Sequence, residues 1–159
     1  MIQYILVAGI CLTLAWTTYQ DFTNRSIRAD TLIIFMVFVL SYNWATYGSV
    51  VFFDQALSLA FLSMVGSIAL IYVRYRMGSF LNWHKAIGLG DIFFIMIAAL
   101  GFCFSQFLLW FNLSLILSLF LHFLLRRKAF YGSSRLIPLA GLQAITLVPF
   151  YGFERLCNY

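Results

Sequence analysis

Long apolar runs separated by short polar stretches dominate this sequence. The apolar segments occupy residues 2–19, 31–49, 56–73, 87–104, 106–125 and 136–153. Each is close to the ~20 residues that an α-helix needs to cross about 30 Å of hydrocarbon. The pattern predicts an all-α polytopic membrane protein, with residues 1–159 forming a single transmembrane domain.

The boundary between the fourth and fifth segments depends on where the chain turns. Residues 92–125 carry no charge. A continuous helix over them would be about 51 Å long, which is far longer than a bilayer core. We therefore expect a tight hairpin at Gly101 and the pair Ser105 and Gln106, which gives six spans.

The positions of the cationic residues support six spans and predict their orientation. Of the ten Lys and Arg residues, all but Arg155 fall in the first, third or fifth expected loop. Loops rich in Lys and Arg stay on the cytoplasmic side of a membrane. A five-span arrangement would place the cations of 126–135 opposite those of 74–85. We therefore expect both termini on the non-cytoplasmic side.

Composition excludes several classes of protein. Hydrophobic residues make up 64% of the chain and charged residues 9%, whereas soluble domains have about a quarter charged residues. The net charge is +5, but in a membrane protein the placement of the cations matters more than their sum; it reports orientation here, and nucleic-acid binding has no support. Cys11, Cys103 and Cys157 form no C-x-x-C pair, so neither a zinc ribbon nor a disulfide framework is expected. The first apolar run has no basic segment before it and is expected to be a retained span.

Two aspartates at the ends of apolar segments are the candidate functional residues. Asp91 stands directly against the apolar run that begins at Ile92, and Asp21 closes the first apolar segment. A carboxylate at the edge of hydrocarbon is costly to ionise and costly to leave unpaired, so it marks a functional site. In the six-span arrangement both lie at the cytoplasmic face at similar depth, although they are 70 residues apart.

A close pair of carboxylates has a defined chemistry. Two such groups a few ångströms apart cannot both be charged cheaply, so they share one proton. The ionised member can draw a proton from water while the neutral member donates to the carbonyl of a peptide substrate. This is aspartic proteolysis, which needs no metal ion, cofactor or nucleophilic side chain. Gly88 and Gly90, just before Asp91, leave room for a substrate backbone.

The other polar residues of the apolar segments have simpler expected roles. Asp30, directly before Thr31, is expected to be the N-cap of the second span, and Asp54 a cap or loop charge before the third. His84 and His122 are too isolated in the sequence for a metal site. The side chains expected to hydrogen-bond between helices are those of Asn43, Asn112, Ser114, Ser118 and Gln143.

The segment Gly88-Leu89-Gly90-Asp91 matches the GxGD signature of intramembrane aspartyl proteases. With Asp21 at the end of the first span, the chain resembles type IV prepilin peptidases and the related preflagellin peptidases. Residues 21–32 stand where this family has an aspartate followed by a basic stretch. The run Ile137-Pro138-Leu139-Ala140 resembles the Ile-Pro motif that opens the family's last span.

The resemblance implies an aspartic endopeptidase of a bacterial cytoplasmic membrane. Asp21 and Asp91 would be its catalytic residues, and Gly88 and Gly90 the motif glycines. The implied partner is a pilin-like precursor, whose basic leader is cut off at the cytoplasmic membrane face just before an apolar helix. Longer family members carry a cysteine-bearing cytoplasmic insertion associated with N-methylation. This chain has no counterpart of it, so cleavage without methylation is expected.

Two alternatives stay open. Ala29 and Phe93 stand where the family pattern has asparagine and lysine, which favours a non-catalytic membrane subunit of a pilus or secretion assembly that keeps the peptidase fold. A proton- or ion-coupled transporter would also use an acidic pair. Transporter sites, however, lie near the bilayer midplane on helices from related halves of the chain, and this sequence shows no internal repeat.

Overall fold

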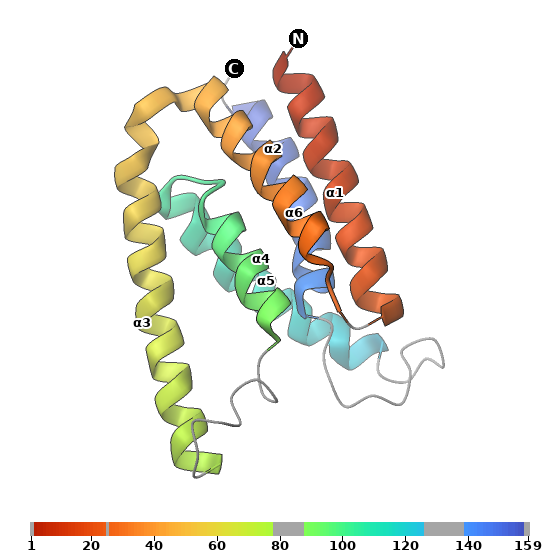
Figure 1. Cartoon of the computed structure of the whole chain (residues 1–159), viewed down its shortest axis with the longest axis vertical. Helices are drawn as coiled ribbons and strands as arrows, with labels where there is room; N and C mark the ends of the chain where they lie inside the picture. The colour runs from red at the N-terminus through yellow and green to blue at the C-terminus, as the bar shows by residue number, and fades with distance from the viewer. Residues whose placement is uncertain (1, 25, 78–87, 126–138, 158–159) are drawn as a thin grey trace.

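The computed structural model describes residues 2–24, 26–77, 88–125 and 139–157, and the secondary structure of these residues is entirely helical (Figure 1). The helices are α1 (Ile2–Asn24), α2 (Ala29–Tyr47), the short 3-10 helix η1 (Gly48–Val51), α3 (Phe52–Met77), α4 (Leu89–Ala99), α5 (Phe104–Leu125) and α6 (Leu139–Cys157). The predicted all-α class is confirmed for this part of the chain.

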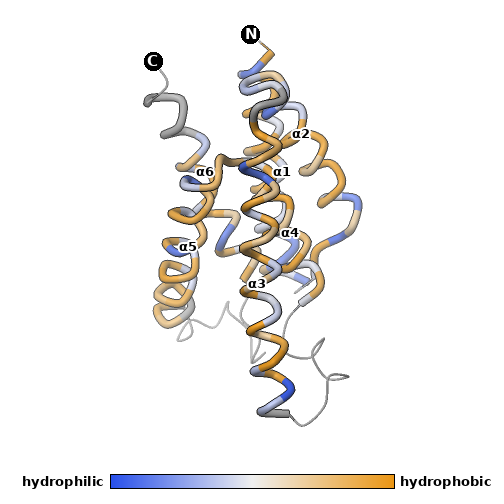
Figure 2. Tube along the Cα trace, turned by 90° about the vertical axis from the view of Figure 1, so that its left-hand side faces the viewer, coloured by the Kyte–Doolittle hydropathy of each residue, from blue (hydrophilic) through white to orange (hydrophobic). Residues whose placement is uncertain are grey.

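The helices have the character of a membrane protein. Four of them, α1, α2, α3 and α5, are long and apolar enough to cross a membrane, and α4 and α6 contribute shorter apolar stretches. Hydrophobic residues make up most of each helix along the chain trace, while hydrophilic residues occur at the lower end of α3 (Figure 2). The fourth helix is shorter than the span expected over 87–104, because α4 has 11 residues and a length of about 16 Å.

Packing in the core holds α4 against α2, α3, α5 and α6. α1 packs on α2 and α6, α5 packs on α6, and α3 stands at the edge against α4 and α5 (Figure 1). The rings of Phe35 and Phe94 stack with centroids 5.4 Å apart and join α2 to α4. Both rings are fully buried. This packing holds the N-terminal turn of α4, which carries Asp91, in a defined place beside α2.

The chain turns between α4 and α5 at residues 100–103, which confirms the predicted break at Gly101, but the prediction is wrong for Ser105 and Gln106, which lie in the first turn of α5. A Cβ atom on Gly101 would lie 3.3 Å from Val39 Cγ1 and still closer to the hydroxyl of Tyr151, so only glycine fits this corner. The carbonyl of Leu100 accepts hydrogen bonds from the side-chain amides of Asn43 and Gln55. Backbone polar groups in a membrane must be satisfied by the protein itself, and these amides from α2 and α3 do so here.

The predicted interhelical hydrogen bonds are only partly present. Asn43 bonds to the α4–α5 corner, and Gln143 Nε2 donates to Ser114 Oγ at 3.5 Å. The prediction for Asn112 is wrong, because its amide donates to the Leu108 carbonyl of the same helix at 2.8 Å. Within the described residues Ser118 Oγ is buried without a hydrogen-bond partner. His84 and the side chain of His122 lie outside the described residues.

The predicted N-cap of the second span is also wrong. α2 begins at Ala29 with Arg28 as its N-cap, so Asp30 lies inside the first turn. Its Oδ2 accepts a hydrogen bond from Arg28 Nη2 at 2.8 Å. The two side chains are 72% and 69% exposed, and such exposed ion pairs contribute little stability. Asp54 similarly lies in the first turn of α3 and not before it.

Candidate functional site

Asp21 and Asp91 meet at the N-terminus of α6. Oδ2 of Asp21 accepts a hydrogen bond from the backbone N–H of Gly141 at 2.7 Å. Oδ1 of Asp91 accepts one from the N–H of Ala140 at 3.1 Å. These two nitrogens belong to consecutive residues. Three covalent bonds join them, so the nitrogens are at most about 4.3 Å apart. The predicted meeting of the two carboxylates at one end of the helical bundle is therefore confirmed.

The N-terminus of α6 attracts both acids for a local reason. The first N–H groups of a helix have no acceptor within the helix, and the helix dipole favours negative charge there. α6 begins at Leu139, directly after Pro138 in the sequence. The two residues that follow are small, so each carboxylate can reach its own backbone amide. α6 thereby aligns side chains that come from α1 and α4.

The two carboxylates differ in their surroundings. Asp21 is only 5% exposed, whereas Asp91 is half-buried. The two carboxylates bond to consecutive backbone amides of α6, so each lies within electrostatic range of the other. Asp21 is thus the enclosed member of the pair, and Asp91 is the more accessible one.

Simpler roles for the two acids do not match their contacts. Asp91 does not cap its own helix, because Gly88 is the N-cap of α4 and no side chain makes a capping hydrogen bond there. Asp21 is not a solvated loop charge, because it lies buried within the last turns of α1. Each carboxylate instead bonds to a helix remote in sequence. Neither position is explained by the local structure of its own helix.

Two glycines allow the acids to take up these positions. A Cβ atom on Gly88 would lie 2.9 Å from Asp91 Oδ2, and one on Gly141 would lie 3.0 Å from Asp21 Oδ2. Gly90 differs, because a Cβ atom there would make an ordinary contact of 3.4 Å with Ile27. Gly141 is a site residue that our sequence reasoning missed. The sequence feature that could have identified Gly141 is its position just after the Ile-Pro motif.

We expect Gly88→Ala to impair the site and Gly90→Ala to spare it. The backbone of Gly88 has φ −67° and ψ 132°, which alanine adopts freely, so the only effect of the methyl group is to push the Asp91 carboxylate away from Ala140. Because a misplacement of about 1 Å can cost about 100-fold in rate, we expect Gly88→Ala to lower activity about 10- to 100-fold. The test is to measure the rate of peptide cleavage and the melting temperature of both purified variants. Equal cleavage rates for Gly88→Ala and Gly90→Ala would contradict the prediction.

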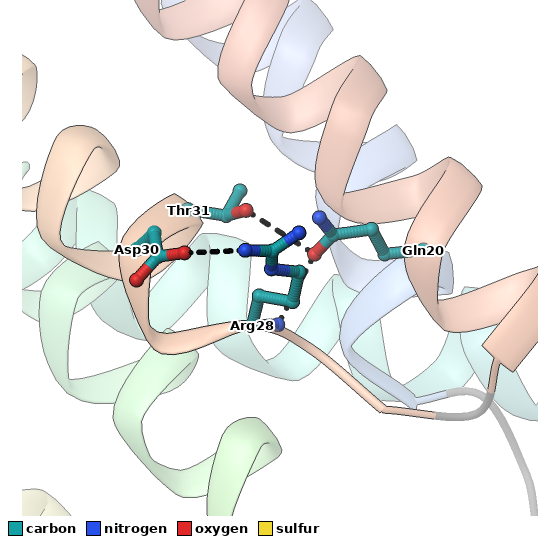
Figure 3. Close-up of polar contacts among 4 residues, drawn as sticks. All are labelled: Gln20, Arg28, Asp30 and Thr31. Carbon is teal, nitrogen blue, oxygen red and sulfur yellow. Dashed lines mark hydrogen bonds and ion pairs between the residues drawn. The ribbon is translucent and has the colours of Figure 1, made fainter.

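Gln20 fixes the connection between α1 and α2 beside Asp21 (Figure 3). Its side chain is 4% exposed, and its Oε1 accepts hydrogen bonds from the backbone N–H of Arg28 at 3.1 Å and from Thr31 Oγ1 at 3.2 Å. Ile27, just before this anchor, packs over Gly90 at the start of α4. The connection therefore links the helix of Asp21 to the helix of Asp91. Our sequence reasoning did not identify Gln20.

Ala29 and Phe93 both line an apolar groove of about 410 Å³ between α2, α3 and α4. Phe93 follows Asp91 by two residues, and on a helix with about 100° per residue it faces the opposite side of α4. Two of the positions that differ from the peptidase pattern therefore belong to the groove, whereas a third, Arg28, does not line it. The acid pair itself is complete without them.

Comparison with protein-family models, with curated proteins and with solved structures finds no match. In the described part of the chain no cluster of three His, Cys, Asp or Glu side chains is placed to hold a metal ion. The site is accordingly defined by four groups: the carboxylates of Asp21 and Asp91 and the backbone amides of Ala140 and Gly141.

Proposed function

We propose that the protein is a membrane-embedded aspartic endopeptidase of the prepilin-peptidase type, which removes the basic leader of a pilin-like precursor. The observation that carries this proposal is the pairing of Asp21 and Asp91 on consecutive amides of α6. Placing two like charges together costs free energy. The N-terminus of α6 compensates part of this cost, because each carboxylate accepts a hydrogen bond from its own backbone amide.

The chemistry follows from one proton shared by the pair. The ionised carboxylate takes a proton from water, whose oxygen attacks the carbonyl carbon of the scissile peptide, while the protonated carboxyl group donates to the carbonyl oxygen. When the tetrahedral intermediate collapses, the C–N bond breaks and a proton passes to the leaving amine. The amides of Ala140 and Gly141 hold one oxygen of each acid and so orient the pair.

The proposal includes the membrane topology. We propose that the protein has six spans, with both termini on the non-cytoplasmic side of a bacterial cytoplasmic membrane and the acid pair at the cytoplasmic face. The distribution of Lys and Arg residues supports this orientation. The end of α1 meets the starts of α4 and α6 at the lower end of the bundle, so both carboxylates lie on the same side of it (Figure 1).

The two alternatives have less support. Ala29 and Phe93, on which the non-catalytic subunit depends, line the groove and leave the acid pair intact. A transporter would place its acids near the middle of the membrane. Here Asp21 lies in the last turn of α1 and Asp91 in the first turn of α4.

Purified protein in liposomes with a pilin-like precursor tests the proposed activity. We expect mass spectrometry to find hydrolysis of the single peptide bond between the leader and the apolar helix. The rate should not change when EDTA or inhibitors of serine and cysteine proteases are added, because the acid pair supplies the chemistry. The new N-terminus should stay unmethylated when S-adenosylmethionine is present. A reaction that stops on addition of EDTA would contradict the acid-pair mechanism.

A further inference from the structure

One polar side chain of α5 lies on the outside of the bundle. Asn112 is exposed, and it stands in the middle of the apolar stretch Phe104–Leu121, about 12 Å from either end. Among the described residues its Nδ2 donates its one hydrogen bond to the carbonyl of Leu108 in the same helix. The amide oxygen Oδ1 and the second N–H therefore face the hydrocarbon of a membrane, where an amide without a partner is costly.

The other polar side chains of the described helices avoid this situation. Amides deep within the helices are buried and bond to another part of the bundle, as Asn43 does at the α4–α5 corner and Gln143 does at Ser114. Apart from Asn112, the exposed side chains with an amide or a charge lie in the first or last turn of a described helix: Gln3, Asn24, Asp30 and Arg74. Asn112 is thus an exception, an amide at mid-span that no described helix covers.

Asn112 belongs to a regular stripe along α5. The other members are hydrophobic residues that are 57% to 68% exposed, and with Asn112 they form what we call the outer stripe: Leu109, Ile116, Leu119 and Phe123. Successive members are alternately three and four residues apart, so at 100° per residue all of them lie within about 80° of one another. The buried residues of α5 lie on the opposite side of the helix: Phe107, Trp110, Ser114 and Ser118. The outer stripe therefore points directly away from the core.

The spacing of the outer stripe is that of a contact line between two helices. Apolar residues that alternate at three and four positions form the seam of a two-stranded coiled coil, and a single asparagine in such a seam fixes the register and the number of helices. α5 packs on α3, α4 and α6, and it stands at an edge of the bundle (Figure 2). The outer stripe is therefore accessible to a helix from outside the chain.

The helix that fits this stripe is α5 of a second copy of the chain. Two copies inserted in the membrane with the same orientation are related by a two-fold axis along the membrane normal, so each residue meets its counterpart at the same depth. Asn112 then lies opposite Asn112 of the second copy. An amide is both a donor and an acceptor, so the two side chains can satisfy each other, whereas a different protein would need a matching polar group at this depth.

We propose that the protein forms a parallel dimer through α5, in which the two Asn112 side chains hydrogen-bond to each other and the apolar members of the outer stripe pack around them. Apolar side chains are solvated by lipid about as well as by protein, so the paired amides supply the specific gain from association. The inference does not depend on the proposed peptidase function, since the acid pair lies on α1 and α4.

Energy transfer between copies that carry a donor or an acceptor dye measures the association of the purified protein in liposomes as lipid is added. We expect Asn112→Leu to need about a tenfold higher protein-to-lipid ratio for half-maximal transfer, because the paired amides are lost. Since Asn112 is exposed, leucine should leave the fold intact, and the melting temperature in detergent checks this. Equal association of the wild type and Asn112→Leu, or no association of the wild type, would overturn the proposal.

Moving the amide distinguishes the outer stripe from the other faces of α5. In Asn112→Leu/Ile116→Asn the amide stays on the outer stripe, about one turn along the helix. In the matched control Asn112→Leu/Leu117→Asn it lies about 100° further around the helix, at a position that is also exposed. We expect the first variant to associate like the wild type and the control to associate like Asn112→Leu. Equal association of these two variants, or stronger association of the control, would show that the outer stripe is not the contact.

Disulfide trapping locates the contact between the copies. The native cysteines Cys11, Cys103 and Cys157 are replaced by serine, and Ile116→Cys, or Leu117→Cys as the control, is then introduced before the membranes are oxidised. We expect a disulfide-linked dimer from Ile116→Cys only, because the two α-carbons must come within about 7 Å of each other. Equal yields from the two variants, or no dimer from Ile116→Cys, would exclude the outer stripe as the interface.

Discussion

Leader cleavage is expected to fall by about 10³-fold or more when either acid of the pair is replaced, in Asp21→Asn or in Asp91→Asn. Asparagine has nearly the shape of aspartate, and its carbonyl oxygen can still accept the hydrogen bond from Gly141 or Ala140. It cannot take a proton from water or share one with its neighbour. Each variant should therefore keep the fold and lose the chemical step.

The measurement is the single-turnover rate of precursor cleavage, together with the melting temperature in detergent. Asp54→Asn is the matched control, because Asp54 also lies in the first turn of an apolar helix but belongs to no pair. We expect the double variant Asp21→Asn/Asp91→Asn to be no slower than either single one, since the two acids act as a unit. Normal leader removal by either single variant would end the assignment of the pair as catalytic.

Gly141→Ala is expected to lower cleavage about 100-fold with only a small loss of stability. The added methyl group would lie 3.0 Å from Asp21 Oδ2, 3.1 Å from its Cβ atom and 3.3 Å from Phe22 Cδ2. Asp21 is 5% exposed and closely surrounded, so its carboxylate must leave the Gly141 amide. A shift of this kind at a reacting group can cost about 100-fold in rate.

The melting temperature of this variant shows whether activity is lost because the Asp21 carboxylate is displaced or because the protein unfolds. Alanine inside a helix is more favourable than glycine by about 0.5–1 kcal/mol, which offsets part of the crowding. Gly66→Ala in α3 is the control, because a Cβ atom there has no neighbour within 4 Å. We expect this control to be fully active and slightly more stable. Full activity in Gly141→Ala would show that the contact between Asp21 and α6 does not position the catalytic group.

Much of the fold could be predicted because hydropathy is a local property. Each long apolar run became a helix, since a backbone in an apolar environment must satisfy its own hydrogen bonds. The break at Gly101 could also be predicted, because an uncharged run of that length has to turn. Because Asp21 and Asp91 stand at the ends of apolar runs, the sequence pattern also predicts that they lie at the same end of the bundle.

Other features depend on distances that sequence spacing does not contain. The shortness of α4 and the first-turn position of Asp30 depend on where each helix begins and ends, and the hydropathy pattern defines those ends only within a few residues. Gln20 looks like an ordinary polar residue of the first segment until the α1–α2 connection folds back onto it. Gly141 resembles any small residue of a helix until Asp21 lies against it.

The sequence alone therefore determined that the chain forms apolar helices, roughly where they run, and which two carboxylates stand at their ends. The tertiary structure decided that these carboxylates bond to neighbouring amides of α6, and that α2 and α4 align their apolar stripes into one groove. The physical reason is range. Hydrophobic runs and helix breaks act over a few neighbouring residues, whereas the site joins groups up to 120 residues apart, whose contact exists only once the helices have packed.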